Sequence, residues 1–325
     1  MSKFKVYITD FDYPDNEIEK RILEPVSAEV IGLQCPSGEG LLEQARDADA
    51  LMVQYAKVYR ETIMGMNNLK VIARYGIGMD IIDVDTAFEK GVVCTNVQDY
   101  CIDEVANHNL SLALMLIRRI PMFIKETKKG KWHWSETGLP VRRFRNLTVG
   151  LVAFGRIARN LAKKLIGLGF RVQTYDPYVS EDDTKAQGVE KVDFKFLISS
   201  SDVVCLQCPY TKDTHHMIGK KELKSMKPTS ILINCARGKL VDNKALYKAL
   251  SKGWIASAGM DDPEEEPAKK VDWTPSGNPL FNLDNCFITP HVAYYTEESL
   301  IEARTTAAEE VAAVLTGRMP KNRVR

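Results

Sequence analysis

The fold of this chain is decided by the segment TVGLVAFGRIA at residues 148–158 and the segment VQTYDP at residues 172–177. A short apolar run is followed by a turn of small residues, a helical pattern of apolar side chains, and a second apolar run that stops at an acid. This order predicts a strand–helix–strand unit, and its turn is typical of those that bind the phosphates of a dinucleotide. A purely structural turn has a similar sequence, so the assignment needs further motifs.

The turn departs from the fingerprint G-x-G-x-x-G at its first and third positions, which are Ala153 and Ala158. The middle position, Gly155, keeps the glycine that lets the backbone approach a pyrophosphate, and Ala158 is small enough for close helix packing. Ala153 lies in the tight turn, where an alanine fits well only if its φ angle is negative. Asp176 ends the second strand, where a carboxylate binds ribose hydroxyls and repels a 2′-phosphate, so the predicted cofactor is NAD rather than NADP.

Length and composition are those of an ordinary globular protein. The chain has 325 residues, 45% hydrophobic and 27% charged, which is long enough for two domains with a core each. A net charge of +1 shows no bias toward nucleic acid or an acidic membrane surface. The longest apolar stretch, residues 110–117, is too short to span a bilayer, and the N-terminus leads directly into a strand pattern. We therefore expect a cytoplasmic protein with no nucleic-acid or membrane partner.

The seven cysteines are scattered, which favours reduced thiols over a disulfide framework. Cys205 and Cys208 have the spacing of a redox or zinc pair, but they lie in a predicted strand, where positions three apart point to opposite faces. The sequence contains no second pair to complete a zinc site. We therefore expect two packed strand cysteines and no metal site.

Short strands alternate with helices along the chain, which predicts mostly parallel sheets with helices on both faces. In the first part, strands are predicted at residues 5–9, 50–54, 71–73 and 92–94, and helices at 17–23, 39–46 and 84–90. In the second part, strands are predicted at residues 171–175, 203–207, 230–234, 256–260 and 286–289, and helices at 193–199, 243–252 and 299–315. Between them, one long helix at residues 102–129 is expected to be interrupted near Pro121, and a basic loop follows with Trp132 and Trp134. The predicted fold class is α/β, with two doubly wound domains.

Three polar residues follow predicted strand ends in the second part, namely Arg237, Glu266 and His291. An Arg can hold a carboxylate and a neighbouring carbonyl oxygen with its planar fork, and a His can give or take the proton on that oxygen. A carboxylate beside the imidazole fixes its tautomer. This set suits hydride transfer between NAD(H) and a 2-hydroxy or 2-oxo acid. Taken singly, each residue is more often a surface ion pair, a solvated acid or a structural histidine, so the hypothesis depends on their order after strands of a dinucleotide fold.

The chain resembles the D-isomer-specific 2-hydroxyacid dehydrogenases over nearly its whole length, and within them the branch of the C-terminal-binding proteins and their bacterial relatives. The matching stretches are ARYGIGMD at residues 73–80, NVQDY at 96–100, EVANH at 104–108, and residues 234–242, 259–267 and 290–291.

The resemblance implies that Arg237, Glu266 and His291 are catalytic, with Glu266 preferred over its acidic neighbours because the family's acid directly precedes a proline. It implies that the substrate-binding residues are Gln54, Tyr55, Ile77, Gly78, Tyr100 and Tyr294, with the backbone N–H groups of Ile77 and Gly78 on the substrate carboxylate. The cofactor-binding residues that the motif and the resemblance predict are Phe154, Gly155, Arg156, Ile157, Asp176, Pro177, Cys208, Pro209, Thr214, Ala236 and Asp261.

The resemblance also implies a domain order and an assembly. The NAD-binding Rossmann domain, residues 102–291, is expected to be inserted into a flavodoxin-like substrate domain made of residues 1–101 and 292–325. Family members are typically homodimers built through the long helix and the loop after it. Two departures from the family pattern stand out: Asp262-Pro263 replaces an apolar pair, and the segment at residues 268–281 is unusually long.

Three hypotheses of function follow. The first is an NAD-dependent D-2-hydroxyacid dehydrogenase acting as a 2-oxo acid reductase, which the complete catalytic set favours. The second is an NAD(H)-sensing, corepressor-like scaffold with little catalytic role. The third is an enzyme for a related substrate such as 3-phosphoglycerate, which needs a phosphate-binding basic patch for which Arg74 is a single candidate. Which 2-oxo acid is used stays open.

Overall fold

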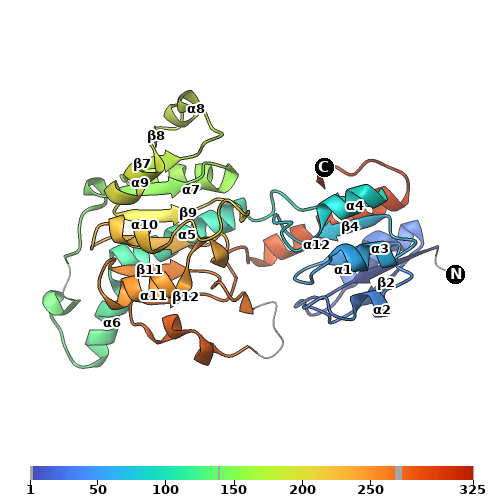
Figure 1. Ribbon diagram of the computed structural model, residues 1–325, viewed down its shortest axis with the longest axis horizontal. Coiled ribbons are helices and arrows are strands. Elements are labelled where there is room, and N and C mark those ends of the chain that lie inside the picture. Colours follow the sequence, from blue (N-terminus) through green and yellow to red (C-terminus); the bar gives the residue numbers. More distant parts are fainter. Residues whose placement is uncertain (1–2, 138–139, 268–272, 325) are drawn as a thin grey trace. The chain divides into compact units, whose positions relative to one another are not determined.

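The computed structural model describes residues 3–137, 140–267 and 273–324. Contacts within the chain divide it into two compact units. Unit 1 contains the described residues up to Cys101, Trp273 and those from Tyr295 onward, and unit 2 contains the described residues of Ile102–Pro267 and Thr274–Tyr294. Each unit has a sheet of mostly parallel strands covered by helices (Figure 1), which confirms the predicted α/β class of two doubly wound domains.

Unit 1 has the strand order of flavodoxin-like sheets. Its parallel strands lie in the order β2-β1-β3-β4-β5, and the direction of this order reverses between β1 and β3. At the edge of the sheet, β13 pairs antiparallel with β5. The strands are β1 (Phe4–Ile8), β2 (Ala28–Gly32), β3 (Ala50–Val53), β4 (Val71–Arg74), β5 (Val93–Thr95) and β13 (Arg323–Val324). The α-helices are α1 (Glu17–Leu23), α2 (Leu41–Gln44), α3 (Arg60–Gly65), α4 (Val84–Lys90) and α12 (Glu297–Leu315).

Unit 2 has a sheet of parallel strands in the order β12-β11-β10-β9-β6-β7-β8, which reverses between β9 and β6. The strands are β6 (Thr148–Val152), β7 (Arg171–Tyr175), β8 (Glu190–Lys191), β9 (Val203–Leu206), β10 (Ile231–Asn234), β11 (Ser257–Met260) and β12 (Cys286–Ile288). The helices are α5 (Ile102–Ile117), α6 (Ile120–Lys128), α7 (Arg156–Gly167), α8 (Glu181–Lys185), α9 (Phe194–Ser200), α10 (Lys220–Ser225) and α11 (Asn243–Ser251). Two apolar clusters form the core, one containing buried residues of α5 and α7 and the other those of α9, α10 and α11.

The long helix predicted at residues 102–129 is two helices, and the break lies before Pro121 rather than at it. Arg119 has a φ of 55°, which ends the helical path between α5 and α6. Pro121 falls in the first turn of α6, where its missing N–H has no partner to lose and its fixed φ suits a helix start.

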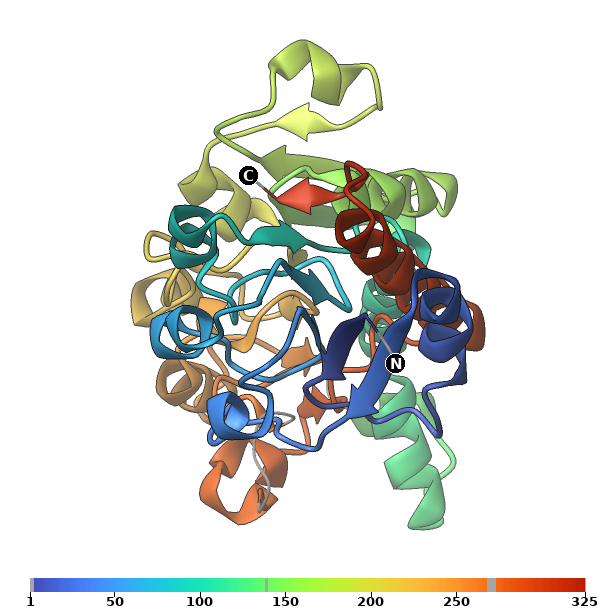
Figure 2. The same cartoon turned by 90° about the vertical axis from the view of Figure 1, so that its right-hand side faces the viewer.

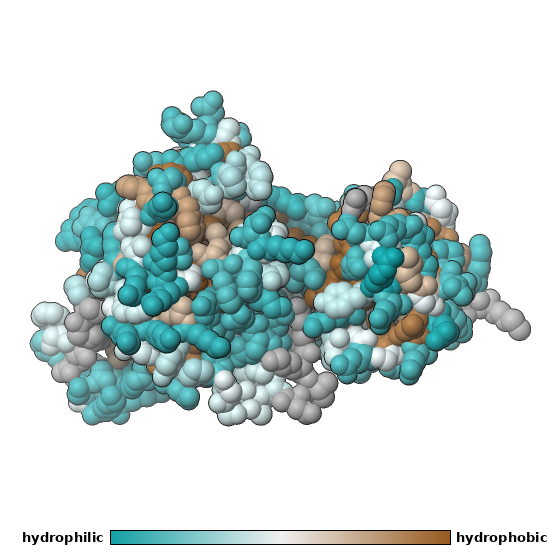
Figure 3. Space-filling view, viewed as in Figure 1, coloured by the Kyte–Doolittle hydropathy of each residue, from teal (hydrophilic) through white to brown (hydrophobic). Residues whose placement is uncertain are grey.

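The elements that the sequence reading did not predict are short or half-exposed. Strand β2 pairs only with β1 and none of its residues is buried, so it lacks the apolar run of a central strand. Helices α8 and α10 are almost entirely polar, although Ser180 before α8 caps it through a hydrogen bond from Asp183 N and is a usable start signal. The view in Figure 3 shows a mainly hydrophilic surface on both units, with apolar residues in scattered patches.

All seven cysteines are free thiols, and both Cys205 and Cys208 are buried, as predicted. Cys205 lies in β9, whereas Cys208 lies just beyond its end. Burial raises the pKa of Cys205 to about 12 and the pKa of Cys208 to about 11, so neither is a reactive thiolate near neutral pH. Among the described residues, we find no helix with the length and apolar character needed to cross a bilayer, and no cluster of side chains suited to a metal ion.

A buried ion pair joins two helices of unit 1. Arg304 on α12 donates from Nε and Nη2 to the Glu19 carboxylate on α1 at 2.8 and 2.7 Å, and the Tyr75 hydroxyl donates to the same carboxylate at 3.1 Å. Burial alone would lower the pKa of Arg304, but the hydrogen bonds and charge of Glu19 raise it above its usual value. Figure 2 shows α12, in dark red, beside α1, in blue.

Removing one partner of this pair should destabilise unit 1 strongly. Glu19→Ala leaves the Arg304 charge buried without its main partner, so we expect the free energy of unfolding to fall by about 3–5 kcal/mol. Glu17→Ala is the matched control, because the Glu17–Lys20 pair is exposed, and it should cost less than about 1 kcal/mol. Urea unfolding followed by circular dichroism measures both, and equal losses would contradict a special role for the buried pair.

Candidate active site

The predicted polar residues of unit 2 lie at one edge of its sheet. The dinucleotide turn follows β6, Asp176 follows β7, and Arg237, Asp261 and His291 follow β10, β11 and β12. Because these strands are parallel, their carboxyl ends meet at the same edge. Open α/β sheets bind ligands at this edge, beside the point where the strand order reverses.

The turn after β6 has the geometry of a phosphate-binding turn, with one strained residue. Ala153 has a φ of 78°, so the condition for a comfortable alanine is not met. Gly155 is the N-cap of α7, and no described atom lies within 4 Å of where a Cβ on it would stand. The first turn of α7 contains no acid, so its N–H groups and dipole suit a phosphate. Arg156 and Ile157 begin this helix.

Asp176 is held by the backbone at the end of β7. Its Oδ2 accepts a hydrogen bond from Phe154 N at 2.8 Å, and its Oδ1 accepts one from Tyr178 N at 2.8 Å. The carboxylate therefore ties the end of β7 to the turn after β6 and keeps a fixed position. Each oxygen retains a lone pair for a ribose hydroxyl. Together with the open space at Gly155, this arrangement fits the NAD that the sequence predicts.

Arg237 lies in a turn that the last residue of β10 organises. The Asn234 side chain donates from Nδ2 to Arg237 O at 2.9 Å and accepts from Ala236 N at 3.1 Å. The next residue, Gly238, has no room for a side chain, since a Cβ would lie 2.3 Å from Pro263 O. The turn that carries Arg237 therefore packs directly on the acidic loop after β11.

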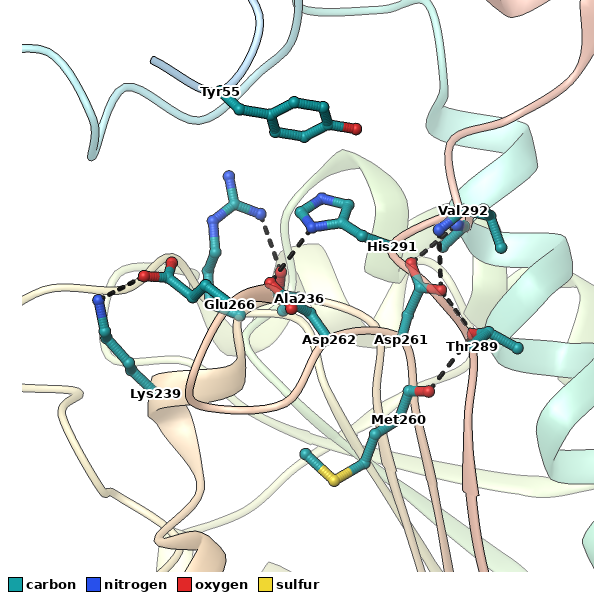
Figure 4. Close-up of polar contacts among 12 residues, drawn as sticks. Tyr55, Ala236, Lys239, Met260, Asp261, Asp262, Glu266, Thr289, His291 and Val292 are labelled. Carbon is teal, nitrogen blue, oxygen red and sulfur yellow. Dashed lines mark hydrogen bonds and ion pairs between the residues drawn. The ribbon is translucent and has the colours of Figure 1, made fainter. Parts of the chain in front are cut away.

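His291 lies in a strained turn after β12, with a φ of 57°. Its N–H donates to Asp261 O at 2.6 Å. The Asp261 carboxylate in turn accepts from Thr289 Oγ1 at 2.5 Å, Val292 N at 3.0 Å and Ala293 N at 2.7 Å, as Figure 4 shows in part. Asp261 thus holds the histidine turn against the end of β11, and its predicted contact with the cofactor stays a prediction.

The imidazole of His291 has a carboxylate partner that the sequence reading did not choose. Its Nδ1 lies 3.2 Å from Asp262 Oδ2, whereas Glu266 Oε2 accepts from Lys239 Nζ at 2.7 Å (Figure 4). The ring of Tyr294 lies edge-on to the imidazole at 6.1 Å between centroids. The sequence contained a signal for Asp262, because an acid there replaces the family's apolar residue.

Other predicted cofactor residues lie in the loop after β9, which hydrogen bonds between its own residues stabilise. Thr214 Oγ1 donates to Pro209 O at 2.9 Å and accepts from Thr211 N at 2.7 Å. Cys208 is buried at the start of this loop. At its end, His216 Nε2 lies 2.6 Å from Glu264 Oε1, a pair that the sequence reading did not find. Pro177 and Ala236 complete the predicted set, next to Asp176 and Arg237.

In unit 1, the predicted substrate residues belong to two turns. The loop after β4 is held by Asn96 Nδ2, which donates to Ile77 O at 2.9 Å, and the Tyr100 hydroxyl lies 3.5 Å from the ideal Cβ position of Gly76. Gly78 continues this loop, so Ile77, Gly78 and Tyr100 belong to one region. After β3, the Asp10 carboxylate accepts from Tyr55 N at 2.6 Å.

Gln54 is the other residue after β3 that is predicted to bind substrate, and both its amide nitrogen and its amide oxygen are hydrogen-bonded to Asp12. Its Nε2 donates to Asp12 Oδ1 at 2.6 Å, and its Oε1 accepts from Asp12 N at 3.1 Å. These contacts brace the turn itself. A direct role of the Gln54 amide in holding substrate therefore stays a prediction.

A comparison with family models decides the identity of this fold. The model of the NAD-binding domain of the D-isomer specific 2-hydroxyacid dehydrogenases matches residues 110–293, more than half of the chain. The chain belongs to this family. Membership confirms the predicted resemblance and makes the protein an NAD-dependent oxidoreductase of 2-hydroxy acids.

Individual dehydrogenases and reductases of this family match nearly the whole chain. D-3-phosphoglycerate dehydrogenase of Methanocaldococcus jannaschii is 38% identical over 98% of the chain, which spans only 59% of that relative's length. Glyoxylate reductase of Thermococcus litoralis is 38% identical over 87% of the chain and 86% of the relative. The solved structure of D-lactate dehydrogenase from Aquifex aeolicus, complexed with NAD and lactic acid, has a TM-score of 0.89 at 30% identity and covers 98% of both chains. These relatives do not support the corepressor-like scaffold, and they do not specify the branch.

The strain at Ala153 gives a prediction about stability. Ala153→Gly removes a Cβ from the left-handed region, so we expect the free energy of unfolding to rise by about 1 kcal/mol. Ala162→Gly, in the middle of α7, is the control and should lower it by at least about 1 kcal/mol, because it loses helix propensity and a buried methyl group. Thermal and urea unfolding of the three proteins measure the difference, and a loss in both variants would mean that Ala153 is unstrained.

Proposed function

We propose that this protein reduces a small 2-oxo acid to the D-2-hydroxy acid with NADH. The observation that carries the proposal is the His291 imidazole against a buried carboxylate, at the same sheet edge as Arg237 and the dinucleotide turn. An acid–base group, a carboxylate-binding cation and a cofactor turn are the three parts that this reduction needs. The relatives named glyoxylate reductase and D-lactate dehydrogenase support the same reaction class.

The roles follow from the chemistry of each side chain. Bound NADH supplies the hydride that C2 of the 2-oxo acid accepts. Arg237 holds the substrate carboxylate and the carbonyl oxygen, which orients C2 and stabilises the charge that develops on the oxygen. Protonated His291 gives its proton to that oxygen, and the backbone N–H groups of Ile77 and Gly78 bind the carboxylate. Glu266 remains the acid that the family pattern assigns to the catalytic set.

The domain roles belong to the same proposal. Residues 102–291 form the cofactor domain, and residues 1–101 and 292–325 form the substrate domain. The dinucleotide turn and Asp176 in unit 2 support this assignment. Free cysteines throughout the chain agree with a reducing compartment, so we place the protein in the cytoplasm.

Glyoxylate is the first substrate to test, because several relatives are glyoxylate reductases. The relatives named 3-phosphoglycerate dehydrogenase make a phosphorylated substrate the main competitor. Arg74, the cation that the sequence offered for a phosphate, is buried and donates from Nη1 to Tyr75 O at 2.6 Å and to Val53 O at 3.3 Å. These contacts disfavour a phosphate on Arg74 and support an unphosphorylated 2-oxo acid.

Steady-state kinetics test the proposed reaction. We expect NADH oxidation with glyoxylate, pyruvate or hydroxypyruvate to exceed that with 3-phosphohydroxypyruvate, and NADPH to be a poor donor. His291→Ala should lower kcat by about 100- to 10,000-fold, because it removes the proton donor. Arg237→Ala should lower kcat/KM by at least about 100-fold. Binding of NADH without turnover on any of these acids would contradict the proposal.

We propose a homodimer built through α5, α6 and the loop after them. Large apolar side chains are exposed there, namely Ile120, Ile124, Trp132 and Trp134, and the two tryptophans are 88% and 78% exposed. Exposed apolar groups gathered in one region are typical of an interface. Residues 138–139 of the same loop lie outside the described residues.

The oligomeric state tests this surface. The double variant Trp132→Asp with Trp134→Asp should shift the protein from dimer to monomer in sedimentation velocity, because it places charge in an apolar contact. Met319→Asp, at another exposed apolar residue, should leave the state unchanged. A monomeric wild-type protein, or dimers of all three proteins, would argue against this interface.

A further inference from the structure

We propose that Asp262 is the positioning residue of His291, a task that the sequence pattern assigns to Glu266. Its carboxylate accepts the Nδ1–H of the imidazole, which leaves Nε2 as the nitrogen that exchanges a proton with the substrate oxygen. The proposal rests on the reductase function proposed above. The contact that carries it is the 3.2 Å distance from His291 Nδ1 to Asp262 Oδ2.

The two acids that follow β11 have different partners. Asp261 and Asp262 come directly after Met260, the last residue of β11. Asp261 is directed to Thr289 and to the N–H groups of Val292 and Ala293, so it holds the turn that carries His291. Asp262 faces the imidazole of that same turn (Figure 4). The backbone of the turn is therefore held by Asp261, and Asp262 is available to orient the ring.

The burial of Asp262 makes the contact specific. Its side chain is 7% exposed, and Oδ1 has no hydrogen-bond partner among the described residues. The donor described for this carboxylate is thus His291 alone. A buried carboxylate with a single donor is costly unless that donor is well placed, so the pair favours one ring orientation and one tautomer.

The three glutamates of the loop after β11 each have another partner. Glu264 Oε1 lies 2.6 Å from His216 Nε2, and Glu266 Oε2 accepts from Lys239 Nζ at 2.7 Å. Glu265 accepts from Asn278 Nδ2 at 2.8 and 3.0 Å. One partner of Glu266 is thus a cation, Lys239, and the residue has a φ of 50°, a strained backbone conformation. Asp262 is the acid of this loop whose contact with the His291 ring the structure describes, at 3.2 Å.

Paired variants at the two acids test the assignment. Asp262→Asn removes the charge with little change of shape, and Asp262→Val restores the apolar residue usual in the family. Both should lower kcat for 2-oxo acid reduction by about 10- to 100-fold. This loss is smaller than the one expected for His291→Ala, because the imidazole is still present but is less well oriented. The KM for the 2-oxo acid and the Kd of NADH should stay within about 3-fold, because Asp262 contacts neither ligand in the proposal. Glu266→Gln should lower kcat less than either variant.

A spectroscopic readout separates positioning from folding. In ¹⁵N-labelled protein near neutral pH, the His291 ring, assigned by its loss in His291→Ala, should carry its proton on Nδ1 in the wild type. In Asp262→Val it should change to a mixture of tautomers, at an unchanged melting temperature. An unchanged tautomer, an unchanged kcat, or a larger loss in Glu266→Gln would overturn the assignment to Asp262.

The same experiments distinguish this failure from a failure of the proposed function. If Asp262 is not the positioning residue, His291→Ala and Arg237→Ala still abolish turnover while the Asp262 variants keep it. If the reductase function itself is wrong, the wild type shows no turnover on any 2-oxo acid. Parallel changes in KM, Kd and melting temperature would make Asp262 a structural residue and would also overturn the proposal.

Discussion

Parallel pairing of the strands in unit 2 is the constraint on which the site depends. Each parallel strand must be followed by a crossover before the chain returns, so the residues after β6, β7, β10, β11 and β12 collect at one edge of the sheet. Residues that are far apart in sequence, such as Asp176, Arg237 and His291, thereby share that edge. The strand order reverses between β9 and β6, so the connections after these two strands run in opposite directions. The dinucleotide turn, which follows β6, lies at this reversal.

Within this frame, hydrogen bonds to strand-end side chains hold the turns. Asp176 joins the ends of β6 and β7, Asn234 shapes the turn with Arg237, and Asp261 fastens the turn with His291. Each is a short polar side chain at or just after the last residue of a strand, and each satisfies backbone groups that a buried turn would otherwise leave without partners. The catalytic candidates are thus carried by turns whose conformation other residues determine.

Backbone strain gathers at the same edge. Among the described non-glycine residues with positive φ are Ala153, His216, Glu266 and His291, all in loops that follow strands β6, β9, β11 and β12. Such conformations cost about 1–3 kcal/mol each and persist where the surrounding structure holds them. Close packing between these loops supports the strained conformations. Because Gly238 has no side chain, the acidic loop after β11 packs directly on the turn with Arg237. Glu264 of the same acidic loop pairs with His216 of the loop after β9. The site is consequently a set of interlocked turns.

The sequence by itself determined the fold class, the cofactor and the polar residues at the strand ends, because local patterns specify them. Alternating strands and helices imply a parallel sheet, and the turn at Gly155 followed by Asp176 implies a dinucleotide. Tertiary structure decided which acid meets His291. The stretch from Asp262 to Glu266 contains four acids, both ends included, and their spacing along the chain does not say which one faces a ring that follows a different strand. That choice depends on the direction of each side chain in its turn and on competing partners such as Lys239 and His216, which only the folded chain brings into place.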